Sequence, residues 1–122
     1  MSEETRIEFK GDYVHVIQPK GYEINPEAME EFYKTLAEFC KANNCYKILA
    51  ECDSPVRKLK LHNAFSNADK LSSQLPLIKL ACCFYNYQVN EISEFFKTAA
   101  FNRGVNVEFF NDKQKALEWL KS

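Results

Sequence analysis

The stretch from Leu77 to Tyr85 constrains the fold more than any other, because it is apolar on both faces apart from Lys79. A strand buried on both faces lies inside a parallel sheet that helices cover on each side. Helical patterns precede and follow this stretch, and a strand–helix–strand unit forms a right-handed crossover between parallel strands. The sequence therefore predicts an α/β fold.

The remaining elements follow from periodicity and turn residues. Residues 6–10 and 13–18 alternate in polarity around a turn that contains Gly11, which predicts a hairpin. Asn25 and Pro26 predict the start of a helix, since Asn caps the free N–H groups and Pro is tolerated at the first helical position. Two further strands are predicted at 46–52 and 105–110, with Gly104 ending the helix before the last strand.

Helices are predicted where apolar residues recur at steps of three and four. The first stripe is Met29, Phe32, Tyr33, Leu36, Phe39 and Cys40; the second is Leu61, Ala64, Phe65, Ala68, Leu71 and Leu75, ended by Pro76. The third is Ile92, Phe95, Phe96, Ala99 and Ala100, and the last is Ala116, Leu117 and Leu120. The predicted order is ββαβαβαβα in one domain over residues 1–122, with a mostly parallel central sheet and an antiparallel edge strand. That edge strand, or the last helix, would support a homodimer.

Charge and glycine content exclude several functions. The chain has 16 Lys and Arg against 17 Asp and Glu, whereas a dedicated nucleic-acid binder is usually basic. Phosphate-binding loops are rich in glycine, whereas this chain of 122 residues has three Gly and no glycine-rich phosphate-binding motif. Neither His15 nor His62 stands at a spacing from a carboxylate and a nucleophile that indicates catalysis. We therefore expect no catalytic residues and no cofactor.

The cysteines indicate reduced thiols rather than disulfides or a metal. Their number is odd and their spacing irregular, at Cys40, Cys45, Cys52, Cys82 and Cys83. Adjacent residues of a strand point to opposite faces, so the last two cannot share a metal ion. Cys40, Cys45 and Cys52 could join His15 as zinc ligands, but no paired spacing supports this. With no secretion signal in Met1–Arg6 and no membrane-length apolar run, the sequence predicts a cytoplasmic protein.

The C-terminal stretch resembles a known family. The run Ala100-Phe-Asn-Arg-Gly104-Val-Asn-Val-Glu-Phe-Phe-Asn-Asp112, followed by Ala116-Leu-Glu-Trp-Leu120, is similar to the ending of SpoIIAA-like proteins of the STAS fold. The order of predicted elements is also similar, so the resemblance covers roughly residues 6–121. It implies a regulatory or binding domain that is usually not an enzyme.

Relatives of this kind include anti-sigma-factor antagonists, which are switched by phosphorylation at the start of the second helix. Their Asp-Ser-Ser/Thr-Gly element corresponds here to Asp53-Ser54-Pro55, without the Gly. Ser54 is therefore the candidate phospho-acceptor. The alternative, which we favour, is that Asp53 or Ser54 caps a helix whose first residue is Pro55.

A basic segment follows Ser54. Residues 57–70 hold four basic residues and one acidic, whereas residues 23–38 hold five Glu and one Lys. Opposed charges of this kind steer a charged protein partner, although many charged helix faces are only solvated. The predicted partner surface consists of Ser54, Arg57, Lys58, Lys60 and His62.

Aromatic residues are abundant, with ten Phe, six Tyr and one Trp. Most would form an aromatic core, but bulky rings can also leave a gap between helices and sheet. The candidate pocket is lined by Tyr85, Tyr87, Phe95 and Phe65, near the carboxyl end of the central strand, where open α/β sheets place ligands. The expected function is a non-enzymatic regulatory protein-interaction domain; the alternative is a binder or sensor of a small apolar, lipid-like ligand.

Overall fold

A computed structural model describes residues 5–58 and 60–122. The prediction about a secretion signal in Met1–Arg6 falls mostly outside these residues. The strands are β1 (Arg6–Phe9), β2 (Val14–Ile17), β3 (Glu23–Ile24), β4 (Lys47–Asp53), β5 (Val56–Arg57), β6 (Lys79–Tyr85) and β7 (Asn106–Phe110). The helices are α1 (Pro26–Asn43), α2 (Leu61–Gln74), α3 (Glu91–Phe101) and α4 (Lys113–Lys121).

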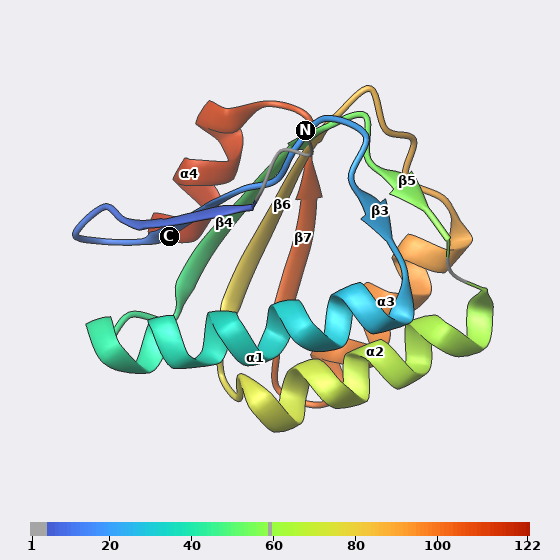
Figure 1. Cartoon of the computed structure of the whole chain (residues 1–122), viewed down its shortest axis with the longest axis horizontal. Coiled ribbons are helices and arrows are strands. Elements are labelled where there is room, and N and C mark those ends of the chain that lie inside the picture. Colours follow the sequence, from blue (N-terminus) through green and yellow to red (C-terminus); the bar gives the residue numbers. More distant parts are fainter. Residues whose placement is uncertain (1–4, 59) are drawn as a thin grey trace.

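The main sheet has the strand order β1-β2-β4-β6-β7. β1 pairs antiparallel with β2, and the other neighbours are parallel, which confirms the predicted α/β fold with an antiparallel edge strand. Helices α1, α2 and α3 cover one face, while α4 packs alone on the other (Figure 1). Within the described residues, no helix has the length and apolar character needed to cross a membrane.

β6 lies between β4 and β7 and is buried on both faces, as predicted. Cys82 belongs to the core beneath α1–α3, whereas Cys83 belongs to the smaller core under α4. The two thiols therefore point to opposite faces, which confirms the expectation from strand geometry.

Two helix boundaries also agree with the sequence. Asn25 caps α1, its side chain accepting a hydrogen bond of 2.8 Å from the N–H of Ala28, and Pro26 is the first helical residue. After α3, Gly104 adopts a φ of +85°, a left-handed conformation that glycine reaches without strain.

A small parallel sheet of β3 and β5 was not predicted. The N–H groups of Val56 and Lys58 donate to the carbonyls of Tyr22 and Ile24, at 2.9 and 2.8 Å. These bonds keep the backbone after Pro55 extended, and α2 begins only at Leu61. The prediction that Asp53 or Ser54 caps a helix beginning at Pro55 is therefore wrong.

The apolar stripes of α2 and α3 mostly agree with the predicted ones, and each differs at one phenylalanine. Phe65 and Phe95 are 51% and 40% exposed, and their rings pack at a tilt of 41° with 6.5 Å between the centroids. Asn67 and Ser93 are buried in their place, at 1% and 4% exposure. Two polar side chains are thus buried, and two phenylalanines that were predicted to be buried are exposed.

Candidate functional site

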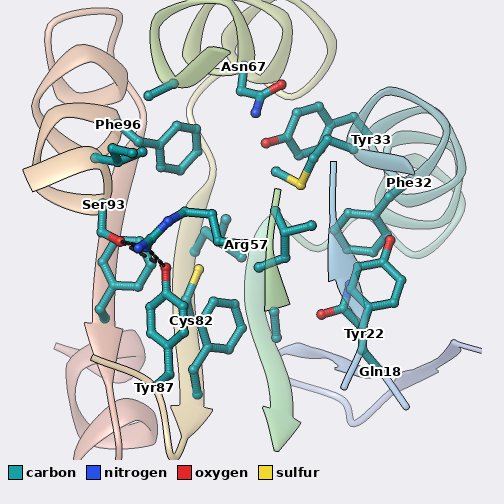
Figure 2. Close-up of a pocket in the computed structure, with 18 residues that line it drawn as sticks. Gln18, Tyr22, Phe32, Tyr33, Arg57, Asn67, Cys82, Tyr87, Ser93 and Phe96 are labelled. Atoms are coloured by element: carbon teal, nitrogen blue, oxygen red, sulfur yellow. Dashed lines mark hydrogen bonds between the residues drawn. The ribbon is translucent and has the colours of Figure 1, made fainter. Parts of the chain in front are cut away.

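A cavity of about 70 Å³ lies between the main sheet and helices α1–α3 (Figure 2). Its wall is mostly apolar and aromatic, with side chains from β4, β6, β7, the three helices and the β3–β5 sheet. The apolar part of the wall includes Met29, Phe32, Ala64, Phe84, Phe96 and Phe109. A concave apolar site with a few placed polar groups is the usual form of a small-molecule site.

Arg57 is the charged residue of the cavity wall. Its Nη1 donates to the hydroxyl of Tyr87 and, at 3.1 Å, to Oγ of Ser93, and these two hydroxyls bond each other at 2.9 Å. The guanidinium also lies 5.4 Å from the centroid of the Tyr87 ring, a distance typical of a cation–π contact. Among the described residues, no carboxylate forms an ion pair with Arg57.

The direction of Arg57 follows from the two-residue strand β5. Successive side chains of a strand point to opposite faces, and here Val56 is 41% exposed while Arg57 turns inward. An apolar residue outside and a charged one inside reverse the usual pattern. Local departures from the usual burial of apolar residues and exposure of charged ones are expected at functional sites.

Two buried polar atoms of the cavity wall have no hydrogen-bond partner within the described part of the chain. These are the hydroxyl of Tyr33 and Nδ2 of Asn67, and each residue is 1% exposed. Figure 2 shows both side chains directed into the same space. Burial raises the pKa of Tyr33 well above its usual range, so the phenol remains a neutral donor and acceptor. Orphan polar atoms of this kind are rare in folded proteins and call for a partner.

The fold places this site at the carboxyl ends of two parallel strands. Arg57 follows β4 after a short turn, and Tyr87 follows β6 in the same way. Ser93 lies in the first turn of α3, which Asn90 caps through bonds to the N–H groups of Ile92 and Ser93. Open α/β sheets bind ligands at this edge.

A second polar cluster lies on the α4 face of the sheet. Glu51 accepts hydrogen bonds from Nε2 of His15 at 2.7 Å and from the hydroxyl of Tyr85, and Nζ of Lys113 lies 3.9 Å from its carboxylate. Burial alone would raise the pKa of Glu51, but the bonds from Tyr85 and His15 outweigh it, and the pKa is lowered. This cluster pairs both oxygens of the carboxylate.

The predicted ligand pocket is partly misplaced. Tyr87 lines the cavity, and Tyr85 lies on the opposite face of the sheet. Phe65 and Phe95 form the exposed pair described above and are not among the lining residues. Placing these three in the pocket was therefore wrong, because strand alternation directs Tyr85 to the other face and Phe65 and Phe95 are exposed on α2 and α3.

The residues of the predicted partner surface lie in two different environments. Lys58, Lys60 and His62 are exposed, whereas Arg57 belongs to the cavity. Arg57 is half-buried and its guanidinium bonds to Tyr87 and Ser93, and the partner surface stays a prediction.

Ser54 lies in the turn after β4, where its φ is +53°. Its Oγ donates to Oδ1 of Asp53 at 2.9 Å, and Nδ2 of Asn86 donates to the same oxygen at 2.9 Å. These bonds from Asn86 and Ser54 lower the pKa of Asp53, so a phosphate on Ser54 would stand beside a negative charge. The helix start that would have stabilised such a phosphate lies elsewhere, at Leu61.

All five cysteines are free, and four of them are buried. Burial raises the pKa of Cys40 to about 11 and that of Cys82, on the cavity wall, to about 12, so both remain thiols at neutral pH. Residues 5–58 and 60–122 contain no group of three His, Cys, Asp or Glu side chains placed to hold a metal ion.

Sequence reasoning missed Ser93, Tyr33 and Asn67 as residues of the site. Asn67 follows Ala64 by three positions and precedes Leu71 by four, so it lies within the helical stripe that these residues define. A polar residue in an apolar stripe was the available signal. Tyr33 was predicted only as a core residue, because its spacing in the sequence does not indicate whether its hydroxyl has a hydrogen-bond partner.

Comparison with solved structures identifies the fold. The chain is 24% identical to an uncharacterised protein of the DUF3478 family from Shewanella loihica, whose crystal structure is described as having a SpoIIAA-like fold. The match covers 98% of each chain with a TM-score of 0.51. This chain has a SpoIIAA-like fold. No protein-family model and no curated protein matches the sequence.

Proposed function

We propose that this SpoIIAA-like domain binds a small apolar ligand in the cavity beneath α1–α3. The observation that supports this most strongly is the pair of orphaned polar atoms on Tyr33 and Asn67, inside an otherwise apolar space. A cavity forfeits packing contacts of the side chains around it, and a buried polar atom without a partner costs about 1–3 kcal/mol. A ligand that fills the space and bonds these atoms removes both penalties.

The size of the cavity limits the ligand. Its volume of about 70 Å³ is roughly half that of the engineered cavity of about 150 Å³ that admits benzene. The space therefore takes the first few carbons of an alkyl chain and not the long chain of a lipid, and because the cavity is open on one side, the rest of a probe such as 1-hexanol can extend from its mouth. Met29 on the wall is flexible and gives room for small differences in shape.

The test is an NMR titration of the ¹⁵N-labelled protein with 1-hexanol, a neutral apolar probe. We expect saturable shifts at residues of the cavity, including the side-chain amide of Asn67. Ala64→Leu places three extra carbons in the space and should abolish the shifts while the protein keeps its thermal stability, because the new atoms fill a void. Ala37→Leu on the half-buried side of α1, outside this cavity, is the matched control and should leave binding unchanged. Absence of saturable shifts in the unmodified protein would reject the proposal.

The exposed aromatic pair favours a second function, the protein interaction that the sequence predicted. Phe65 and Phe95 lie side by side on the surface, and His62 is three residues before Phe65 on the same face of α2. Lys58 and Lys60 are exposed just before that helix. Aromatic residues beside basic ones suit an acidic protein partner with an apolar anchor.

Charge reversal tests this second function. We expect Lys58→Glu with Lys60→Glu to prevent salt-sensitive binding of the partner from the native host, and Phe65→Asn to weaken the same complex. Lys115→Glu, at an exposed site on α4, is the charge-matched control. A complex that survives both changes would exclude this surface.

The proposal includes no catalysis and a cytoplasmic location. The serine hydroxyl of the cavity wall, Oγ of Ser93, bonds Arg57 and Tyr87 rather than a base that would activate it. Four buried free thiols suit a reducing compartment. Dimerisation through the edge strand β1 or through α4, and phosphorylation of Ser54, stay predictions.

A further inference from the structure

We infer that the ligand of this cavity is a short apolar carboxylate whose carboxylate group pairs with Arg57. The inference rests on the ligand-binding function proposed above and adds the chemical class of the ligand. Three observations support it: the inward direction of Arg57, its unused hydrogen-bond donors, and the polar atoms across the cavity from it.

The first observation is the charge itself. Turning Arg57 inward removes part of the hydration of a guanidinium, and this costs free energy unless an anion or several acceptors replace the water. Its partners among the described residues are two neutral hydroxyls and an aromatic ring, on Tyr87 and Ser93. No described carboxylate balances the charge, so a ligand with a negative group would supply the missing partner.

The second observation concerns donor geometry. A guanidinium carries five N–H donors in a planar fork. Only Nη1 of Arg57 has hydrogen-bond partners among the described residues, which leaves the donors on Nη2 and Nε available. Adjacent donors of this fork match the two oxygens of a carboxylate in a bidentate pair.

The third observation is the position of the polar atoms across the cavity from Arg57. The Tyr87 and Ser93 hydroxyls hold the guanidinium at one side of the cavity, and Ser93 belongs to the first turn of α3, where the helix dipole favours an anion. Tyr33 and Asn67 lie across the space from Arg57 (Figure 2). A carboxylate at Arg57 would therefore direct the apolar body of the ligand between the aromatic walls, and a hydrogen-bonding atom at the far end of that body would meet the unpartnered hydroxyl of Tyr33 and Nδ2 of Asn67.

The test compares ligands that differ only in the head group. Butanoate and hexanoate are titrated against 1-butanol and 1-hexanol by NMR at pH 7.4, where both acids are ionised. We expect each carboxylate to bind at least ten-fold more tightly than the alcohol of equal length. Arg57→Met, which keeps a side chain of similar length without the charge, should reduce that ratio to about two or less while the alcohols still bind.

Arg103→Met is the matched control. Arg103 also lies over an aromatic ring, 4.4 Å from the centroid of Phe65, but it stands outside the cavity wall. This variant should keep the full preference for the carboxylate. Its failure to do so would mean that general charge, and not Arg57, sets the preference.

The outcomes separate this inference from the function on which it rests. If the alcohols bind as tightly as the carboxylates in the unmodified protein, the carboxylate inference is overturned and the apolar ligand site stands. If neither class binds, both proposals fail. The unmodified protein decides these cases alone, so poor folding of Arg57→Met cannot obscure the result.

Discussion

Each face of the sheet carries a charged residue bonded to a tyrosine hydroxyl, and the two clusters differ in how completely that charge is paired. On the α4 face, Glu51 is surrounded by donors from His15, Tyr85 and Lys113. On the α1–α3 face, Arg57 bonds only neutral hydroxyls. One cluster has a charge with complementary partners, and the other has a charge without a counter-ion among the described residues.

The difference suggests two roles for buried polar groups in one small domain. A satisfied cluster rigidifies its surroundings, whereas a partly satisfied one costs stability unless something else completes it. On the cavity side, the free donors of Arg57 come together with the orphan atoms of Tyr33 and Asn67. We therefore expect substitutions on the α4 face to reduce stability and equivalent substitutions on the cavity side to alter binding.

The largest effect on stability is expected for Glu51→Ala. Removing this carboxylate leaves Nε2 of His15 and the hydroxyl of Tyr85 without their acceptor, and breaking a buried pair costs about 3–5 kcal/mol. The Glu51 side chain is 20% exposed, so we expect a somewhat smaller loss, about 2–3 kcal/mol, in urea unfolding. The control is Glu8→Ala, whose pair with Lys10 is exposed and screened by solvent, so its loss should change stability much less than the loss of Glu51. Equal losses for the two variants would contradict the comparison.

The same chemical change at two tyrosines should have opposite effects. Tyr85→Phe removes a donor to the Glu51 carboxylate and should destabilise the protein by about 1–2 kcal/mol. Tyr33→Phe removes an orphaned hydroxyl and should leave the ligand-free protein unchanged or stabilise it by up to about 1 kcal/mol. Thermal unfolding of protein stripped of ligand measures both. A clear loss of stability in Tyr33→Phe would show that its hydroxyl has a partner after all.

Acid should weaken the contribution of Glu51. Its pKa is lowered in the folded state, so its ionised form adds stability above its unfolded pKa of about 4.3 and loses it as the pH falls through the folded value. The stability difference between the unmodified protein and Glu51→Gln should therefore shrink as the pH falls from 7 to 3. The groups that face this carboxylate are His15, Tyr85 and Lys113. A difference that stays constant over this range would refute the assignment.

Much of this fold could be predicted because the spacing of apolar residues indicates which face of each helix or strand is buried. The double-sided burial of β6 and the cap at Asn25 were both visible in the residues. The β3–β5 sheet was not, because two residues are too few to show a period, and its hydrogen bonds join segments far apart in the sequence. That small sheet is also what turns Arg57 toward the cavity.

The candidate site was harder to predict for a related reason. Hydrophobicity favoured Phe65 and Phe95 for the core, yet Asn67 and Ser93 lie inside. In each helix the prediction fails at one position of the stripe, and this single exchange places a polar residue, not a phenylalanine, on the cavity wall. The positions at which sequence reasoning failed are thus the positions at which the site carries its polar groups.

The smallest loss of stability is expected for a substitution in the exposed aromatic pair. Its effect on ligand binding, compared with that of a substitution on the cavity wall, tests whether the pair lies outside the site. Phe65→Asn removes a contact with Phe95 and with Arg103 but opens no buried space, so the loss of stability should be about 0.5–1 kcal/mol. Binding of 1-hexanol should not change, because Phe65 does not line the cavity. Phe96→Asn is the contrasting variant, since Phe96 is on the cavity wall one position after Phe95, and it should weaken hexanol binding at least five-fold. If Phe65→Asn impaired hexanol binding as much as Phe96→Asn, the aromatic pair would have to belong to the ligand site, as its sequence first suggested.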